Sequence, residues 1–166
     1  TGCMAQRYKE EITEEIPEVD AVLGTTSYGD IVKALNEAEA GHVFREFKDI
    51  NALPEDSGRR VITTGGHFGY LKIAEGCDKH CTYCIIPSLR GKFRSVPEER
   101  LLKQAEYMAS QGVRELILVA QETTVYGTDL YGKKTLHILL KKLCQIKGIR
   151  WIRVLYCYPE EIYDEL

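Results

Sequence analysis

The sequence predicts an α/β protein, in which strands and helices alternate along the chain. Two observations support this fold class. In residues 70–166, three short apolar runs alternate with three amphipathic runs, giving the order β-α-β-α-β-α. Residues 115–120 read Glu-Leu-Ile-Leu-Val-Ala, a nearly continuous apolar run that is typical of a strand in a parallel sheet covered on both faces. A shorter alternation of the same kind occupies residues 1–45.

The first segment predicts one strand between two helices. A charged amphipathic helix is expected over residues 4–15 and ends before Pro17, which cannot continue it. A short buried strand is expected over residues 19–23, closed by Gly24, and a second helix over residues 30–40.

Residues 46–69 predict a linker. They hold Pro54, Gly58 and further glycines, with scattered charges and weak periodicity. One strand of a hairpin is expected inside this linker, over residues 60–64.

The second segment is more strongly patterned. Ser95-Val96-Pro97 and the acids behind it indicate a helix start, because proline and acidic residues favour the first helical turn. Cys144 falls on the apolar side of a later helix, where we expect it to pack in the core. The predicted strands cover residues 70–74, 115–120 and 151–156, and the predicted helices run from 95–97 to about 111, from 135 to 146 and onward from 159.

Polar or reactive residues follow each predicted strand of this segment. A cysteine-rich loop follows the first, Gln121 to Thr124 follow the second, and Cys157 to Pro159 follow the third. Parallel β/α units place ligand sites at the carboxyl ends of their strands. We therefore expect the three loops to lie on one rim of the fold.

The cysteine loop is the most informative feature of the sequence. Cys77, Cys81 and Cys84 are spaced C-x3-C-x2-C, so that three thiolates can converge on one centre. Thiolates are soft ligands that select iron–sulfur clusters, zinc or copper. Structural zinc sites normally have four ligands, whereas three on a cubane cluster leave one iron open. The spacing favours a cluster, with a zinc site completed by His80 or a distant cysteine as the alternative.

Composition excludes several classes of protein. The net charge of −3 provides no global basic field for nucleic-acid binding. No apolar run approaches the roughly 18–20 residues that span a bilayer. The clustering of three of the six cysteines, without a signal peptide, favours metal binding in a reducing compartment. We expect a cytoplasmic protein without a membrane partner, and both ends of the sequence suggest a fragment of a longer chain.

The cysteine segment resembles the signature of the radical S-adenosylmethionine (radical SAM) superfamily, including the aromatic Tyr83 before the last cysteine. The resemblance implies that Cys77, Cys81 and Cys84 hold a 4Fe-4S cluster. It also implies that the open iron binds the amino and carboxylate groups of S-adenosylmethionine, and that Tyr83 packs near the adenine. One electron then splits the sulfonium C–S bond, leaving methionine and a 5′-deoxyadenosyl radical.

Longer strings resemble the methylthiotransferase branch of this superfamily. They are Ala74–Cys77, Ile85–Gly91 and Arg94-Ser95, although Val96 stands where the branch often has arginine. Gly2–Tyr8 and Pro17–Asp20 resemble the end of that branch's amino-terminal domain. The resemblance implies the end of an amino-terminal α/β methylthiotransferase domain (1–45), a linker (46–69) and the first β/α units of a radical SAM partial TIM barrel (70–166).

Further site residues follow from the resemblance and from position. Cys3 matches one of three ligands of a second 4Fe-4S cluster, the other two being expected upstream of this sequence. Gln121 and Glu122, at a strand end, are expected to contact S-adenosylmethionine. Arg153 lies within an apolar strand and points either inward, toward the cofactor carboxylate, or outward to a helix. Arg90 and Arg94 flank the cysteine loop, either as solvated side chains or as charge support for the cluster or cofactor.

The strings Gln121–Gly127 and Leu155–Pro159 most resemble those branch members that modify a small-subunit ribosomal protein. The implied reaction adds a methylthio group to an aspartate β-carbon, with a low-potential electron donor of the flavodoxin or ferredoxin type. Two alternatives remain open. One is a tRNA methylthiotransferase with the same chemistry on a base, and the other is a non-catalytic module that binds zinc or a cluster.

Overall fold

The computed structural model describes residues 1–53 and 60–166. Pro54 and Gly58, which contributed to the linker prediction, lie outside the described residues. The chain folds into two compact units. The first contains the described residues up to Leu53 together with Lys79–Gly91, and the second contains residues 60–78 and Lys92–Leu166.

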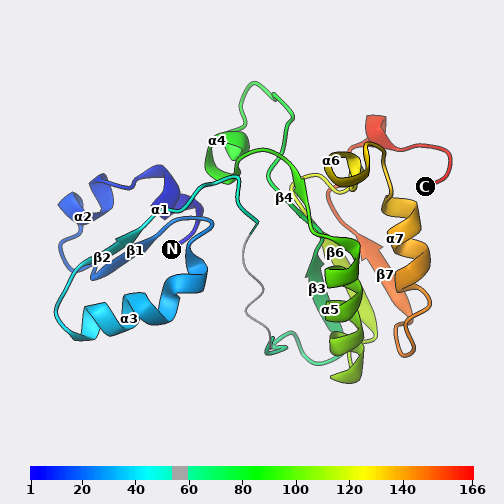
Figure 1. Ribbon diagram of the computed structural model, residues 1–166, viewed down its shortest axis with the longest axis horizontal. Helices are drawn as coiled ribbons and strands as arrows, with labels where there is room; N and C mark the ends of the chain where they lie inside the picture. The colour runs from blue at the N-terminus through cyan, green and yellow to red at the C-terminus, as the bar shows by residue number, and fades with distance from the viewer. Residues whose placement is uncertain (54–59) are drawn as a thin grey trace. The chain divides into compact units, whose positions relative to one another are not determined.

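The first unit is a small α/β layer (Figure 1). Two short strands, β1 (Ala21–Leu23) and β2 (Phe44–Glu46), pair in parallel, and α3 (Ile31–Glu39) packs beside them after the 3-10 turn η1 (Tyr28–Asp30). Three further short helices belong to this unit: α1 (Cys3–Arg7), α2 (Glu11–Glu15) and α4 (Ile86–Arg90).

The single helix predicted over residues 4–15 is wrong, because the chain breaks between α1 and α2. At the break, the Lys9 carbonyl accepts a hydrogen bond from the Arg45 guanidinium, which also pairs with Glu10 at 2.8 Å. A distant arginine thus satisfies a carbonyl that a continuous helix would have used. Strand β2 was not predicted, because its sequence Phe-Arg-Glu lacks the continuous apolar run that marked β1 and is too short to show a period-two pattern.

The second unit is built on a three-stranded parallel sheet. Its strands are β3 (Phe68–Lys72), β6 (Glu115–Val119) and β7 (Trp151–Val154), in the order β3-β6-β7. Helices α5 (Glu98–Ser110) and α7 (Leu136–Leu143) connect these strands and cover one face of the sheet (Figure 1). The predicted alternation of strands and helices is confirmed for this part of the chain.

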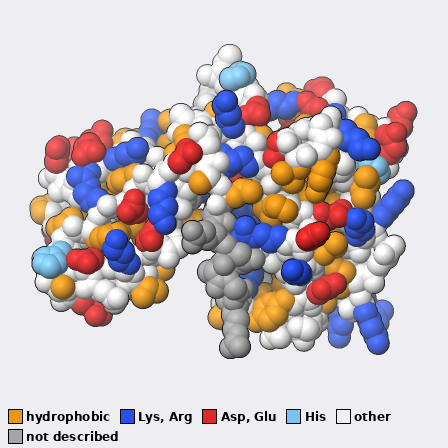
Figure 2. Space-filling view, viewed as in Figure 1, with side chains coloured by type: hydrophobic (Ala, Val, Ile, Leu, Met, Phe, Trp, Pro, Cys, Tyr) orange, Lys and Arg blue, Asp and Glu red, His pale blue; other side chains and the backbone are white. Residues whose placement is uncertain are grey.

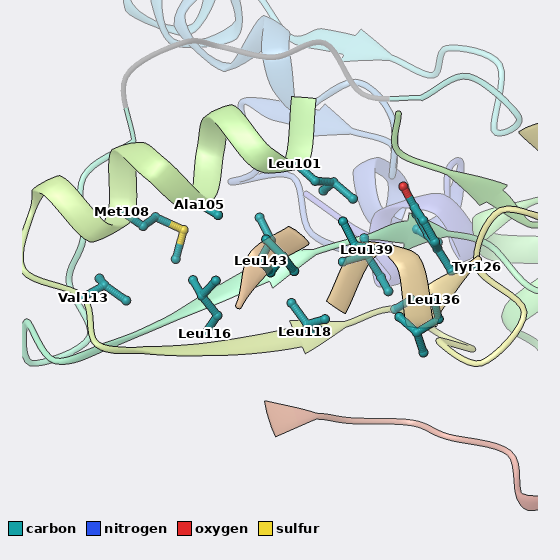
Figure 3. Packing of buried hydrophobic residues seen from close by; sticks show 14 of the residues in the cluster. Leu101, Ala105, Met108, Val113, Leu116, Leu118, Tyr126, Leu136, Leu139 and Leu143 are labelled. Carbon is teal, nitrogen blue, oxygen red and sulfur yellow. The ribbon is translucent and has the colours of Figure 1, made fainter. Parts of the chain in front are cut away.

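Leucines fill the space between the sheet and its helices (Figure 3). Leu116 and Leu118 of β6 pack in one cluster with Leu101 and Met108 of α5 and Leu139 of α7, and all of these side chains are fully buried. Burying an aliphatic side chain of this size contributes about 1.5–3 kcal/mol, so this cluster is the main source of stability in the unit.

Alternate residues of the same strands point to the opposite face of the sheet. Ile152 and Val154 pack against the leucine cluster, which places Arg153 between them on the other side. The strand register aligns Arg153 with Ile117 and Tyr70. The face away from α5 and α7 is therefore mixed aromatic, apolar and charged.

The chain bends at the end of β3. Strand β4 (Ala74–Glu75) leaves the main sheet and pairs antiparallel with β5 (Arg94–Ser95), so the strand predicted over residues 70–74 is divided in two. The short helix α6 (Thr128–Tyr131) is tied to this ribbon, because Asp129 accepts a hydrogen bond from the Ser95 backbone N–H at 2.8 Å.

Three smaller predictions fail for identifiable reasons. Residues 60–64 form no strand; instead the Arg60 and Thr64 side chains donate to backbone carbonyls of β3, at 2.5 Å in each case. The helix expected from residue 159 is only a 3-10 turn, η2 (Pro159–Glu161), and Ile162 leaves it in an extended conformation. Helix α7 ends at Leu143, so Cys144 is exposed rather than buried in the core.

No helix within residues 1–53 and 60–166 is both long enough and apolar enough to span a membrane.

We predict that Gly127→Ala destabilises the protein much more than Gly132→Ala. Both glycines flank α6 in the left-handed region, at φ of 91° and 68°. An alanine at either position lowers the free energy of unfolding by about 1–2 kcal/mol, because its backbone is strained in the left-handed region. At Gly127 the added methyl group would also collide with the Thr135 hydroxyl, whereas the space around Gly132 is open to 4 Å. Overpacking adds about 1–3 kcal/mol. Urea denaturation followed by circular dichroism measures both variants, and equal losses of stability would contradict the packing argument.

We further predict that Tyr126 makes stability fall at alkaline pH. Its hydroxyl donates to the Val96 carbonyl at 2.8 Å, and burial, with smaller contributions from Tyr131, Glu98 and Asp129, raises its pKa. An unfolded tyrosine ionises near pH 10 while the folded phenol stays protonated, so the free energy of unfolding decreases as pH rises above about 10. Tyr126→Phe should cost about 1 kcal/mol at pH 8 through the lost hydrogen bond. It should also flatten the decline between pH 8 and pH 10.5; an unchanged slope would refute the role of this phenol.

Candidate active site at the strand ends

The loops that follow β3 and β6 are joined by a hydrogen bond. The backbone N–H of Gly76, directly before Cys77, donates to the side-chain Oε1 of Gln121 at 2.9 Å. Gln121 lies two residues beyond the end of β6. This contact fixes the start of the cysteine segment against the neighbouring strand end.

The loops that follow β6 and β7 are joined as well. Buried Thr123 donates from its hydroxyl to the Leu155 carbonyl at 2.9 Å and from its backbone to the Tyr156 carbonyl at 3.2 Å. The Tyr158 N–H donates to the Thr124 hydroxyl at 3.3 Å. The prediction that the three loops share one rim is therefore confirmed for the loops after β6 and β7 and for the start of the cysteine loop at Gly76.

Tyr156 takes a conformation that is costly for its residue type. Its φ of 60° is left-handed, which a bulky non-glycine residue adopts rarely and at a cost of about 1–3 kcal/mol. The two hydrogen bonds from Thr123 to its carbonyl hold it there. Its neighbour Cys157 is exposed and lies 3.4 Å from the Thr123 hydroxyl, in a loop rather than in the core.

A buried carboxylate stands at the entry to the cysteine segment. The Glu75 side chain is 2 % exposed, forms an ion pair with Lys72, and accepts a hydrogen bond from the Gly76 N–H at 3.3 Å. Sequence reasoning missed this residue; the available signal was an acid directly after the predicted strand, three positions beyond Lys72. Because a buried charge is stable only when paired, Glu75 and Lys72 hold this turn in one geometry.

The cysteine segment is shared between the two units. Cys77 belongs to the second unit, whereas Cys81 and Cys84 belong to the first. All three are half-buried thiols, and the Cys84 N–H donates to the Cys81 carbonyl at 3.0 Å in a tight turn. Tyr83, between them, is 91 % exposed.

The donor set suits a soft metal centre. Three thiols lie within a span of eight residues, and the backbone from Gly76 to Ile85 forms neither helix nor strand. Across residues 1–53 and 60–166, no three His, Cys, Asp or Glu side chains already stand in a metal-binding arrangement. Thiols are the soft donors that hold such a cluster once they are deprotonated.

Cys3 has a specific partner in the first unit. The Arg90 Nε donates to the Cys3 Sγ at 3.0 Å, and both residues are half-buried. From the sequence, Arg90 was expected to lie near the cysteines of the loop, and no contact with Cys3 was predicted. Because the two residues are 87 positions apart, no local pattern indicates this contact.

Two further residues were predicted to contact S-adenosylmethionine: Glu122 lies in the loop after β6, and Arg153 lies within β7. Glu122 is buried, and its Oε1 accepts from the Thr124 backbone N–H at 2.9 Å and from the Thr124 hydroxyl. Arg153, on the sheet face away from the helices, forms an ion pair with Glu115 at 2.7 Å. Of the two orientations considered for Arg153, the structure has the one that points away from the covering helices.

The other surfaces of the molecule are less specific. An open groove of about 740 Å³ lies between α5 and α7, on the side remote from the strand-end loops, and is lined by ordinary helix surface residues such as Glu106 and Lys142. On the face shown in Figure 2, acidic and basic side chains are interspersed. The strand-end rim therefore remains the candidate site.

Comparisons with known proteins identify the same region. The profile of the radical SAM superfamily matches residues 71–166. A protein named "Ribosomal protein uS12 methylthiotransferase RimO" from Lachnoclostridium phytofermentans is 63% identical over the whole of this chain, which covers 38% of that relative. Proteins of the same name from Clostridium botulinum and Clostridioides difficile are 54% and 51% identical, with 37% of each relative covered.

The chain thus spans less than two fifths of the length of these relatives. The superfamily match, by contrast, covers more than half of the chain and includes the cysteine loop and the loops after β6 and β7. On this evidence, the chain belongs to the radical SAM superfamily.

Proposed function

We propose that the full-length protein carrying this sequence is a radical SAM methylthiotransferase that modifies an aspartate β-carbon of a small-subunit ribosomal protein. The observation that carries this proposal is the 63% identity, over all 166 residues, to a relative named as a ribosomal protein uS12 methylthiotransferase. The C-x3-C-x2-C loop at the carboxyl end of a parallel strand supports it independently.

In this proposal, Cys77, Cys81 and Cys84 hold a 4Fe-4S cluster. A cluster with three protein ligands supplies an open iron for S-adenosylmethionine and a strongly reducing electron, since such clusters reach about −700 mV. The thiols must be deprotonated and held close together for this role. Glu75, Lys72 and Gln121 serve it by fixing Gly76, the residue before the first ligand.

Four residues are proposed to contact S-adenosylmethionine besides the cluster ligands. The exposed ring of Tyr83 offers an aromatic surface for the adenine. Arg153 offers a guanidinium for a carboxylate, because its side chain is 55% exposed and pairs with Glu115 only at one edge. Gln121 and Glu122 follow the end of β6 and are proposed as further contacts, their Oε1 atoms accepting hydrogen bonds from Gly76 and Thr124 in this structure.

The target carbon explains the need for radical chemistry. An unactivated carbon has no acidic proton for a general base to remove, so hydrogen-atom abstraction is the available route.

The proposal includes a second 4Fe-4S cluster, partly held by Cys3, that delivers the sulfur atom. It also includes a low-potential flavodoxin or ferredoxin and a cytoplasmic location. The division into residues 1–45, 46–69 and 70–166 belongs to the same proposal.

The substrate is tested with the full-length protein, reconstituted anaerobically with iron and sulfide. We expect a peptide from the ribosomal protein that contains the target aspartate to gain a methylthio group, measured as a mass increase. Replacing that aspartate by alanine in the peptide should abolish the increase. A tRNA anticodon stem-loop serves as the competing substrate, and modification of that RNA instead of the peptide would overturn the proposed target.

We predict that Cys81→Ala abolishes cleavage of S-adenosylmethionine whereas Cys144→Ala does not. Cys81 is a proposed ligand, and losing it should lower 5′-deoxyadenosine production by more than the ~100-fold that outer-shell changes typically cause. Cys144 is an exposed thiol at the end of α7 and is the matched control. Iron and sulfide content are measured in parallel. If the Cys81→Ala protein still produced 5′-deoxyadenosine at the parent rate, the ligand assignment would be wrong.

A further inference from the structure

We propose that Arg90 is a positioning residue for the second cluster, acting through its hydrogen bond to Cys3. This inference rests on the proposed function, in which Cys3 is a ligand of that cluster. The Arg90 Nε lies 3.0 Å from the Cys3 Sγ and donates to it. A guanidinium bonded to a ligand sulfur supplies both a hydrogen bond and a fixed positive charge.

The position of Arg90 is set by packing within the first unit. Helix α1, which carries Cys3, packs against α4, which ends at Arg90. The Thr25 hydroxyl donates to the Leu89 carbonyl at 2.9 Å, next to Arg90 in the chain. The Thr25 N–H in turn donates to Gln6 of α1 at 3.2 Å. A chain of hydrogen bonds therefore holds the end of α4 beside α1.

The same short segment carries ligands of the other cluster. Lys79–Gly91 folds with the first unit and contains Cys81 and Cys84 as well as Arg90. One continuous segment of 13 residues thus joins two proposed ligands of the radical SAM cluster to the side chain that bonds a ligand of the second.

The charge on Arg90 predicts a direction for the reduction potential. Reduction adds negative charge to a cluster and its ligand sulfurs, and a nearby donor with positive charge stabilises that reduced form. Removing the donor therefore lowers the potential of the second cluster. Arg7, on the same helix as Cys3, provides a matched control because its guanidinium lies over the Tyr8 ring at 5.1 Å instead.

The experiment uses the full-length protein with Cys77, Cys81 and Cys84 all replaced by alanine, so that only the second cluster remains. In this background, Arg90→Gln, Arg90→Lys and Arg7→Gln are compared by redox titration monitored by electron paramagnetic resonance. We expect Arg90→Gln to shift the reduction equilibrium about tenfold toward the oxidised form, which is 59 mV for one electron. Arg90→Lys keeps the charge and should shift it less, and Arg7→Gln should leave it near the parent value.

The outcomes separate the two proposals. If the triple-alanine protein binds no iron and sulfide, the second cluster is absent and the proposed function fails together with this inference. If the cluster forms and Arg90→Gln has the same potential as Arg7→Gln, the inference alone fails. If Arg90→Gln does not assemble the cluster, the potential of Arg90→Lys is compared with that of Arg7→Gln. A lower potential in Arg90→Lys supports the inference. The same parent-like potential and line shape in both variants would show that the Nε hydrogen bond has no influence and would overturn it.

Discussion

Parallel pairing of β3, β6 and β7 is the constraint on which the candidate site depends. In a parallel sheet all carboxyl ends lie on one edge, so the residues that follow each strand are gathered there whatever their distance in sequence. The leucine cluster under α5 and α7 fixes the register of these strands, because a slip by one residue would turn Leu116 and Leu118 out of the core. Packing on one face of the sheet therefore determines the geometry of the rim.

Backbone-directed hydrogen bonds then refine the rim. Gln121 and Thr123 both leave β6, and they bind the loops after β3 and β7 respectively. The site is thus anchored on its central strand. Gln121, which was predicted to contact the cofactor, therefore also stabilises a loop. A substitution at Gln121 would disturb the start of the cysteine segment as well as any ligand contact.

Sequence patterns predicted the elements that are long and locally determined. The apolar run of residues 115–120 and the amphipathic helix after Pro97 give β6 and α5 almost as expected, because burial and local propensity favour the same structure. The spacing of three cysteines in eight residues likewise indicated a cluster site without any structure. These features depend on neighbours in the chain.

What the sequence did not reveal depends on distant partners. Strands β2 and β5 have three and two residues, and they exist because β1 and β4 pair with them. Arg45 bonds the backbone at the break after α1, and Arg90 bonds Cys3, each from a remote part of the sequence. A single sequence carries no periodicity for such contacts.

The discontinuous composition of the first unit limits how the protein can be dissected. Lys79–Gly91 leaves the second unit, folds with α1 and β1, and returns at Lys92. A recombinant piece that begins near residue 60 would keep Cys77, Cys81 and Cys84 in sequence but would lack the surface on which two of them are folded. Such a minimal barrel would expose Leu89 and Arg90 without their partners Thr25 and Cys3. Residues 79–91 and the amino-terminal region therefore fold as one unit.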